Sequence, residues 1–491
     1  MVIWNDVLKQ LQNRAKQLEQ AGKNKEALEL YAEILKQEPG NALIYNAAAV
    51  VLYNIGRFKD AGVYFSRAIE LNPNYAEAYA NLGALHAKFK EYDKAVKLYQ
   101  ACIKIKPSYA GAYTNLGNAL NKTGRHEEAV YFHKTAIALD DKSANHYSNC
   151  ASAYKNLGRF DKAKKLYEKT LSIEPEHVNA HFDLATVLLQ TGEYARGWKE
   201  YEWRFLKEEM QGHIQKYKEI FDAPRYEGQR LDGERVLVHA EQGFGDTLMV
   251  ARYLFELKRR GATVVLYLRD GLRELFETME CVDEIYTREQ KLPAFDYQTA
   301  FMSLPLYLDK ELKNITQDYP YIKMDESYSL GCEKVKIGIV WSASKTGESY
   351  ANKVFDLRHF TKMSKDANLQ LYSLQLGEDS EQLVTYDLKD DIIDLSKKIH
   401  SFYETAKIIN ALDLVITSDT SVAHLAGAMG KKVWILLQKV PDWRWGVHGE
   451  KSLWYPSARL FWQHSLGDFN SVFAQVYREL EREFNVKVED V

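Results

Sequence analysis

A 34-residue period runs through the first 210 or so residues and constrains the fold more than any other sequence feature. Three columns repeat with it: Ala27, Ala61, Ala95, Ala129 and Ala163; Gly22, Gly56, Gly124, Gly158 and Gly192; Pro39, Pro73, Pro107 and Pro175. The small alanines let two antiparallel helices approach closely. Each glycine ends a first helix, where a left-handed residue is needed. Each proline ends a second helix, because it cannot continue the hydrogen-bond ladder. Lys90 alone breaks the glycine column, and Asp141 fills the missing proline place.

This period and its helix–turn–helix punctuation resemble the tetratricopeptide repeat. About six units follow one another, over 8–41, 42–75, 76–109, 110–143, 144–177 and 178 to about 210. Such superhelices bind extended peptides or partner proteins along their concave face. In the last unit Gly197 stands in the alanine place, and the pattern decays as in a terminal repeat that packs on something else. We expect the repeats to occupy 1–210 and a connecting helix or linker to occupy 211–230.

One polar column bears on what the repeats hold: Asn81, Asn115 and Asn149, continued by Asp183. An amide both donates and accepts hydrogen bonds, so a ladder of them can bind a peptide backbone without reading its sequence. The column resembles the asparagine ladder of the nucleocytoplasmic O-GlcNAc transferase. The alternative is a row of ordinary solvated residues, because Asn is common at this place in tetratricopeptide repeats.

Beyond the linker, short β-rich runs alternate with helical stretches. They form two series, at 235–240, 263–269, 283–288 and 296–303, and at 336–341, 369–375, 392–396, 412–419, 432–438 and 458–463. Alternating strands and helices predict parallel sheets covered on both faces. We therefore expect two Rossmann-like lobes, over 231–330 and 331–491, with ligands bound in the cleft at the carboxyl ends of the strands.

The first strand ends in a glycine-rich loop that contains Glu241, Gln242, Gly243, Gly245 and Asp246. The two glycines would let the backbone approach a ligand, and an amphipathic helix is expected over 248–258. Neither a dinucleotide fingerprint nor a phosphate-binding P-loop is present. The carboxylate of Asp246 could cap the helix, a role that Asp fills well. It could also point into the cleft as a general base that takes a proton from an acceptor hydroxyl.

A second loop follows the 412–419 strand and contains Asp419, Thr420, Ser421 and His424. It opens a helix whose free N–H groups and dipole suit a diphosphate, and His424 could donate to a phosphate oxygen. Ordinary capping by Ser or Thr beside a packed His is the alternative. Further on, Trp443 and Arg444 lie in an aromatic stretch that suits either a nucleobase or sugar, or an interface between the lobes.

The two loops resemble those of glycosyltransferase family nine, which includes the ADP-heptose heptosyltransferases, and the 441–463 stretch resembles bacterial proteins that fuse such a domain to tetratricopeptide repeats. The resemblance covers about 231–463. It implies a GT-B fold, no catalytic metal, no cofactor beyond the nucleotide-sugar substrate, and inversion at the anomeric carbon. It implies that Asp246 is the base and that Asp419, Thr420 and His424 lie at the donor phosphates. It also suggests that Lys345 lies near the diphosphate, with Ser342 close by.

These observations predict a protein glycosyltransferase whose repeats hold the acceptor and whose base activates a Ser or Thr hydroxyl. The resemblance to the bacterial fusion proteins suggests that the acceptor is flagellin or another surface protein. Two alternatives stay open: sugar transfer to a lipid-linked saccharide, and a non-catalytic repeat scaffold. The net charge of −3 gives no attraction to nucleic acid. Four scattered cysteines suit a reducing compartment. Because neither a signal peptide nor a membrane-spanning run is recognisable, we expect a cytoplasmic location.

Overall fold

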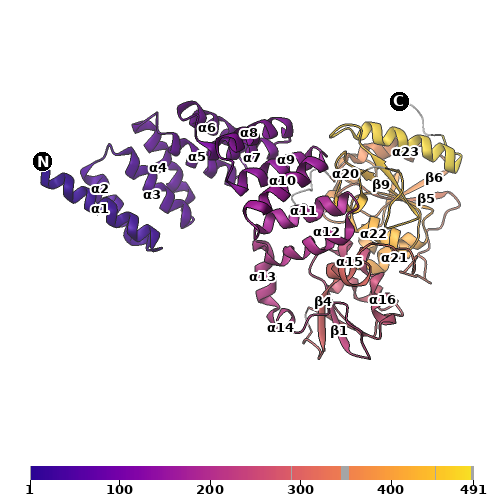
Figure 1. The fold of residues 1–491 in the computed structure, drawn as a ribbon. Coiled ribbons are helices and arrows are strands. Elements are labelled where there is room, and N and C mark those ends of the chain that lie inside the picture. Colours follow the sequence, from indigo (N-terminus) through magenta and orange to yellow (C-terminus); the bar gives the residue numbers. More distant parts are fainter. Residues whose placement is uncertain (1, 289, 344–352, 448, 488–491) are drawn as a thin grey trace. The chain divides into compact units, whose positions relative to one another are not determined.

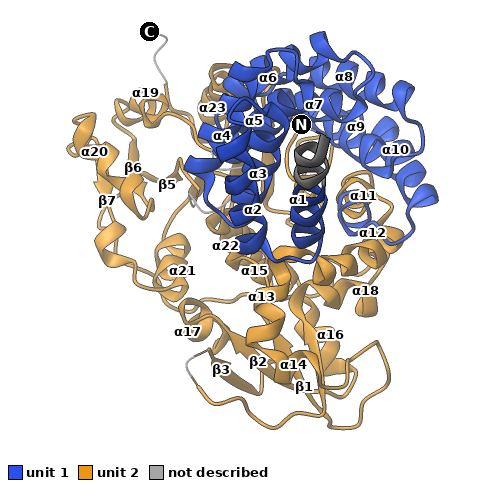
Figure 2. Cartoon of the chain, turned by 90° about the vertical axis from the view of Figure 1, so that its left-hand side faces the viewer, with its two compact units in different colours: residues 1–183 blue, residues 184–491 orange. Residues whose placement is uncertain are grey.

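The computed structural model describes residues 2–288, 290–343, 353–447 and 449–487. The chain forms two compact units, Met1–Asp183 and Leu184–Val491 (Figure 2). The boundary falls inside a helix of the sixth predicted repeat, so the end of that repeat belongs to the second unit.

The first unit consists of antiparallel helix pairs (Figure 1). Their bounds are α1 Val2–Gln20, α2 Asn24–Gln37, α3 Ala42–Asn54, α4 Phe58–Leu71, α5 Ala76–Lys88, α6 Tyr92–Ile105, α7 Ala110–Lys122, α8 His126–Leu139, α9 Ala144–Asn156 and α10 Phe160–Ile173, and α11 Val178–Gln190 crosses the boundary. Each alanine of the predicted column is fully buried. Helices α3, α5, α7 and α9 contact one another in succession and so line one side of the superhelix.

The turn inside each pair confirms the need for a left-handed residue. The five glycines of the column have φ between 70° and 88°. Lys90, which replaces glycine in the third unit, takes φ 61°. The helix-pair geometry therefore imposes this conformation even on a residue with a Cβ atom.

In the second unit α11 is followed by α12 Tyr194–Tyr201, the 3₁₀ helix η1 Glu202–Leu206, α13 Glu208–Lys216 and α14 Lys218–Phe221. The segment expected as a connection packs on the first sheet. Ile220 is 2% exposed in a cluster with Leu237 and Val265, and Arg225 bridges to Gln298.

Two parallel sheets confirm the two-lobed α/β architecture. The first has the order β3-β2-β1-β4, with β1 Arg235–His239, β2 Thr263–Leu268, β3 Glu284–Thr287 and β4 Tyr297–Ala300. The second has the order β10-β9-β8-β5-β6-β7, with β5 Val335–Val340, β6 Leu369–Ser373, β7 Ile392–Asp394, β8 Leu414–Ser418, β9 Val433–Leu437 and β10 Ala458–Trp462. Each of these ten strands lies within a predicted run, except that β5 begins one residue before its run.

Helices and 3₁₀ turns connect these strands. In the N-terminal lobe they are α15 Phe244–Val250, α16 Tyr253–Arg259, η2 Asp270–Leu272, α17 Arg273–Phe276, η3 Phe301–Ser303 and α18 Leu304–Leu308. In the C-terminal lobe they are η5 Leu357–Phe360, α19 Thr361–Ser364, η6 Glu378–Glu381, α20 Gln382–Thr385, η7 Ser396–Lys398, α21 Phe402–Asn410, α22 Ser421–Ala428, η8 Trp443–Trp445 and α23 Phe469–Phe484.

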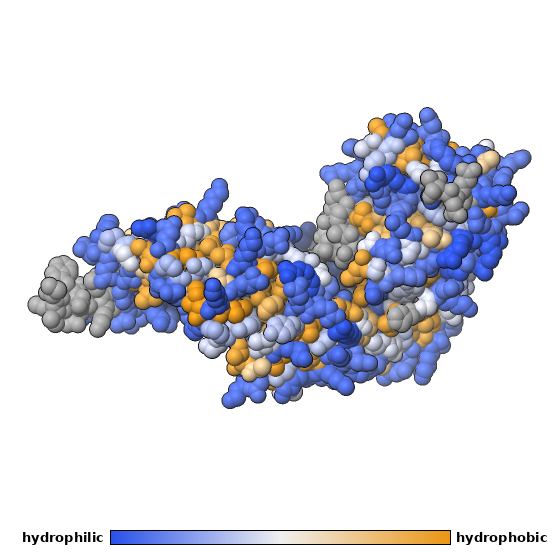
Figure 3. Space-filling view, turned by 90° about the horizontal axis from the view of Figure 1, so that it is seen from above, coloured by the Kyte–Doolittle hydropathy of each residue, from blue (hydrophilic) through white to orange (hydrophobic). Residues whose placement is uncertain are grey.

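The single helix expected over 248–258 is wrong in detail, because a turn at Ala251 and Arg252 separates α15 from α16. The guanidinium of Arg252 donates to the carbonyl of Met249 at 3.1 Å and to that of Trp454 at 2.8 Å. A buried arginine that binds carbonyls of both lobes thus sits at the break. On the face shown in Figure 3, hydrophilic residues predominate over each unit, and smaller hydrophobic patches are scattered among them.

Candidate functional site

A cleft of about 940 Å³ opens between the two sheets of the second unit. Segments that follow β1, β2, β5, β6 and β8 line it, as the rule for open parallel sheets requires. Of the predicted residues, it brings together Gly243, Gly245, Asp246, Ser342, Asp419, Thr420, Ser421, His424 and Arg444.

The two predicted loops touch each other directly. Helix α15 packs on α22, and a Cβ atom at Gly245 would lie 2.7 Å from Cδ2 of His424. Gly245 therefore has a packing reason that sequence reasoning missed: it makes room for the imidazole of the opposite lobe. Gly243 serves the loop differently, because its N–H donates to Asp246 Oδ2 at 3.1 Å.

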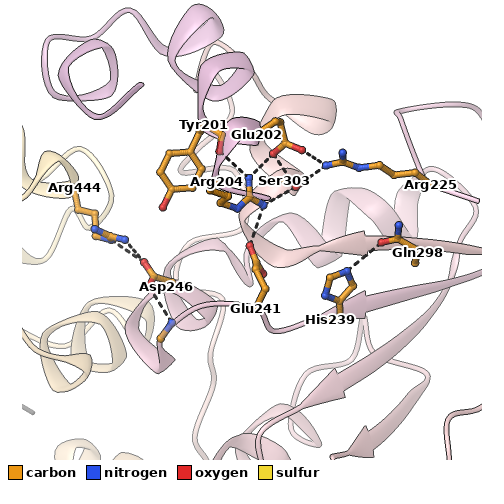
Figure 4. Close-up of polar contacts among 11 residues, drawn as sticks. Tyr201, Glu202, Arg204, Arg225, His239, Glu241, Asp246, Gln298, Ser303 and Arg444 are labelled. Atoms are coloured by element: carbon orange, nitrogen blue, oxygen red, sulfur yellow. Dashed lines mark hydrogen bonds and ion pairs between the residues drawn. The ribbon is translucent and has the colours of Figure 1, made fainter. Parts of the chain in front are cut away.

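Asp246 lies in the first turn of α15 and joins the lobes (Figure 4). Its Oδ1 accepts hydrogen bonds from Nε of Arg444 at 2.8 Å and from an Nη atom of the same guanidinium. The side chains of Asp246 and Arg444 are 14% and 13% exposed, at the wall of the cleft. The capping and cleft-facing interpretations are therefore compatible, since one oxygen caps the loop and the other meets the opposite lobe.

An aromatic cluster supports the turn that carries Arg444. Trp443 lies edge-on to Trp198 and Tyr201 of α12, with ring centroids 5.5 and 5.9 Å apart. The side chain of Gln190 at the end of α11 donates to the carbonyl of Gly446. Trp443 is 6% exposed and does not line the cleft, so its surroundings favour the packing alternative. The last repeat, whose sequence pattern is irregular, thus packs against η8 and fixes its position, and η8 places Arg444 at the cleft.

The N-terminus of α22 opens onto the cleft without a side-chain cap. Thr420 is the N-cap residue with φ −129° and ψ 169°, but its hydroxyl makes no capping hydrogen bond. Instead it lies 2.9 Å from the hydroxyl of Thr417. Within the described residues, no side chain therefore satisfies the first N–H groups of the helix, which face the cleft beside Ser421 and Val422.

His424 lies in the first turn of α22 and is 3% exposed. Its Nδ1 is 2.8 Å from the hydroxyl of Tyr455, and its ring stacks on Trp445 at 5.0 Å. Burial lowers the pKa of His424 to about 4, against the opposing effect of Asp419. The imidazole is therefore neutral at physiological pH and can offer a hydrogen bond but not a charge.

Asp419 pairs with Lys353, whose Nζ is 2.6 Å from Oδ2. Burial by itself would raise the pKa of Asp419, but Lys353, His424 and Arg444 together outweigh it and the pKa is lowered. Lys345, the predicted cation, lies outside the described residues. Lys353, eight positions further along the sequence, lines the cleft. Sequence reasoning missed it, although a second lysine in the same stretch of sequence was the available signal.

Ser342 follows β5 and is 3% exposed. Its N–H donates to Oε1 of Gln375 at 2.9 Å, and its hydroxyl donates to Oδ2 of Asp379 at 2.5 Å. Both partners line the cleft at the end of β6. Ser342 is therefore held by its own lobe at the edge of the space predicted for the donor.

Glu241 belongs to the first loop but does not line the cleft, and its side chain points toward Arg204 (Figure 4). Its buried carboxylate accepts from Arg204 of η1 at 3.0 Å, and Arg204 also contacts Glu202 and Ser303. This network anchors the start of the loop to the end of the repeat region. Gln242, which is half-buried, does not line the cleft either.

The polar column of the repeats is less uniform than a ladder requires. Asn81 donates to Oδ1 of Asn46 at 3.0 Å. Asn149 donates to the carbonyl of Asn145 at 2.7 Å, and Asp183 pairs with Lys155 at 2.5 Å. All four residues of the column, Asn115 included, are partly exposed on the first helices of their pairs. Acceptor binding by this column stays a prediction.

Two parallel sheets with a cleft at their carboxyl edges form a GT-B type α/β unit, and helix pairs of 34 residues precede it. Residues 260–455 match glycosyltransferase family 9 (heptosyltransferase). Tetratricopeptide-repeat families match 18–85, 90–124, 108–173 and 154–197. The chain thus carries tetratricopeptide repeats and a glycosyltransferase family 9 domain. The match includes the second loop and Arg444 but begins after Asp246.

Among curated proteins, Protein FlbA of Caulobacter vibrioides is 23% identical over 304 residues, which are 52% of this chain and 49% of FlbA. The chain therefore spans about half the length of this relative. Among solved structures, MamA is 26% identical with a TM-score of 0.31, over 33% of this chain and 95% of MamA. TTC0263, a tetratricopeptide-repeat protein of Thermus thermophilus, is 22% identical with a TM-score of 0.33, over 37% and 99% of the two chains.

No helix of the described residues is long and apolar enough to cross a membrane. No group of three or more His, Cys, Asp or Glu side chains in the same residues is arranged to hold a metal ion.

Proposed function

We propose that the chain is an inverting glycosyltransferase that needs no metal and moves a sugar from a nucleotide-sugar donor to a hydroxyl group of a protein. One observation carries the proposal: Asp246 and the uncapped N-terminus of α22 face the same cleft, although they come from opposite lobes. A carboxylate and an anion site on one cleft suit a reaction in which a hydroxyl is deprotonated while a diphosphate departs.

The chemistry follows from these two groups. The acceptor hydroxyl oxygen attacks the anomeric carbon from the face opposite the leaving group, and the carbon–oxygen bond to the diphosphate breaks. The hydroxyl proton passes to the carboxylate of Asp246, whose Oδ2 keeps a lone pair beside its bond to the N–H of Gly243. The diphosphate leaves with the bonding electrons against the N–H groups at Ser421 and Val422.

Other cleft residues would assist this departure. Lys353 is held beside the helix start by Asp419 and adds positive charge near the diphosphate. The neutral imidazole of His424 offers a hydrogen bond. Arg444 would orient the carboxylate of Asp246, because it binds Oδ1 and leaves Oδ2 to the acceptor.

The acceptor part of the proposal rests on the repeats. A superhelix with partly exposed Asn81, Asn115, Asn149 and Asp183 suits an extended polypeptide, which a transferase for small acceptors would not need. We propose a Ser or Thr hydroxyl of flagellin or another surface protein, modified in the cytoplasm.

The donor site can be tested by deleting one backbone N–H. Ser421 is the first residue of α22, where proline is well tolerated because its φ suits the position. Thr420 before it has the extended conformation that proline requires of its neighbour. Ser421→Pro should therefore fold but bind nucleotide sugars about ten- to a hundredfold more weakly, by loss of a charge-assisted hydrogen bond. Ser421→Ala, which keeps the N–H, is the matched control.

Binding is measured by calorimetry with the full chain and a panel of ADP-, GDP-, UDP- and CMP-sugars. Equal affinities of the two variants would remove α22 from the donor site. Mass spectrometry of proteins from the source cells, incubated with the bound nucleotide sugar, then tests transfer. Sugar on a lipid-linked saccharide instead of a protein would refute the acceptor assignment, and no binding of any nucleotide sugar would leave a non-catalytic scaffold.

A further inference from the structure

Arg269 is a cleft residue whose positive charge is left without a partner by the described part of the chain. It follows β2 at the carboxyl edge of the first sheet and lines the cleft. Its side chain makes no hydrogen bond or ion pair with any described residue, and its Nε is buried. Its guanidinium lies over the ring of Phe244 at 5.3 Å, which holds the group in place without neutralising it.

Three other arginines of the same unit, of which Arg204 and Arg252 are buried and Arg444 is partly buried, differ from Arg269, which is itself partly exposed. Arg204 contacts Glu202, Glu241 and Ser303. Arg252 donates to three backbone carbonyls and a tyrosine hydroxyl, and Arg444 pairs with two aspartates. Removing a cation from water without pairing it is costly, so such groups are normally satisfied. Arg269 is partly withdrawn from water, and no described carboxylate pairs with it, so its charge is available to an anion that enters the cleft.

A second cation strengthens this indication. Arg288, which follows β3, donates to the carbonyl of Ala240 at 2.6 Å and lies over the ring of Tyr217 at 5.4 Å. It has no carboxylate partner among the described residues either. Burial lowers the pKa of Arg269, and Arg288 lowers it further, while Asp246 opposes them. Two like charges thus lie near each other in the N-terminal lobe, and of the two Arg269 lines the cleft, as Asp246 does.

We propose that Arg269 binds an anionic group, a carboxylate or a phosphate, of the substrate that the N-terminal lobe holds beside Asp246. The inference rests on the proposed function, because it assigns a chemical class to a substrate of the same cleft. It differs from the diphosphate site, which lies on α22 of the other lobe. The anion belongs either to the transferred sugar or to the acceptor, next to the hydroxyl that is glycosylated.

The variant Arg269→Gln removes the charge and keeps a hydrogen-bonding side chain. Arg259→Gln is the matched control: it removes the same charge from the same lobe, but from a guanidinium that pairs with Asp318 and Glu256 and does not line the cleft. Arg269→Lys restores the charge without the forked geometry and should recover part of the loss.

The donor arm compares nucleotide sugars in pairs that differ by one carboxylate, such as UDP-glucose with UDP-glucuronate and GDP-mannose with GDP-mannuronate. The acceptor arm compares serine peptides flanked by glutamate with the same peptides flanked by glutamine. In one arm the wild type should prefer the anionic member. Arg269→Gln should reduce that preference by about ten- to a hundredfold, whereas Arg259→Gln should leave it unchanged.

A third arm needs no transfer. Inorganic phosphate at matched ionic strength should raise the melting temperature of the wild type more than that of Arg269→Gln. If nucleotide sugars fail to bind and this difference persists, the proposed function fails and the anion site stands. If sugars bind and are transferred, but Arg269→Gln equals the wild type in every arm, the anion site is refuted. Equal losses for neutral and anionic members would refute it as well.

Discussion

The two units of the chain differ in how far apart in the sequence their contacting residues lie. In the repeat unit, a residue with a packing role, such as Gly83 beside Tyr99, contacts a neighbour in the same or the next helix pair. In the α/β unit, contacts at the cleft join segments that are far apart in the chain. Asp246 and Arg444, for example, are separated by 198 positions. The difference indicates that a substitution should stay local in the repeats but reach the cleft in the α/β unit.

The comparison also explains what could be predicted. Because each repeat contacts mainly its neighbours, its packing rules recur every 34 residues and become visible as columns. Contacts between the lobes occur once and leave no periodic trace. A substitution at a lobe contact should therefore have larger functional effects than a chemically similar one in a repeat, and the following experiments test this.

Asp246→Asn should have the largest effect. Loss of the general base should reduce the rate of transfer by about 10²- to 10⁴-fold, while the affinity for the donor changes little. Asp442→Asn is the control, because Asp442 is the other carboxylate on Arg444 and an asparagine still caps η8. Transfer is followed by mass spectrometry and donor binding by calorimetry. Normal transfer by Asp246→Asn would end the assignment of the base.

Acidification should weaken the repeat unit through His133, which is fully buried with both ring nitrogens unpartnered in the described structure. Burial, and then His146, lowers the pKa of His133 to about 4 from 6.5. Because the unfolded chain binds a proton at this histidine more readily than the folded one, protonation favours unfolding. The free energy of unfolding is therefore at its full value above pH 6.5 and falls as the pH is lowered toward 4. The loss amounts to about 3 kcal/mol.

His133→Leu should remove this acid sensitivity from the repeats. Amide hydrogen exchange of repeat peptides between pH 7 and 4 measures it. His424 is the counterpart in the α/β unit, with a pKa of about 4 and the same sign. Peptides of that unit should therefore keep their own acid sensitivity in His133→Leu. Equal acid sensitivity of repeat peptides in both proteins would show that His133 is not the cause.

A matched pair of glycines gives a direct comparison of the units. A Cβ atom at Gly83 of α5 would lie 2.8 Å from Cε1 of Tyr99, and one at Gly427 of α22 would lie 2.6 Å from Cδ1 of Tyr455. Either Gly→Ala change should destabilise its unit by about 1–3 kcal/mol through overpacking. Tyr455 also contacts His424 in the cleft, so only Gly427→Ala should weaken donor binding.

Thermal melting and calorimetry measure the two effects of this pair. Weaker donor binding by Gly83→Ala, or unchanged binding by a destabilised Gly427→Ala, would contradict the difference between the units.

The sequence was sufficient for the repeats, the ten strands and the two loops, because periodicity and alternation carry that information. It was insufficient for contacts between the lobes. Nothing near Gly245 indicates that His424 packs on it, and nothing near Asp246 indicates a pair with Arg444. Lys353 was missed because Lys345 lies in the same stretch of sequence. No sequence motif marks Arg269. It stands out only because no described residue pairs with its guanidinium, and this can be seen only in the three-dimensional structure.

Substitution of Lys90 should have the smallest effect, and it should stabilise the protein, whereas the glycine substitutions above destabilise it. It stands in the glycine place of its repeat with φ 61°, a conformation that costs a residue with a Cβ atom about 1–2 kcal/mol. Glycine removes this strain but loses about 0.5–1 kcal/mol through the entropy of the unfolded chain. Lys90→Gly should therefore stabilise the repeats by up to about 1 kcal/mol.

Gly124→Lys, at the same place one repeat later, should destabilise the repeats by a similar amount. An added Cβ atom there meets no neighbour, so only the backbone conformation changes. Urea unfolding measures both, and donor binding should not change in either. A stabilising Gly124→Lys would show that neighbouring repeats do not share one backbone rule.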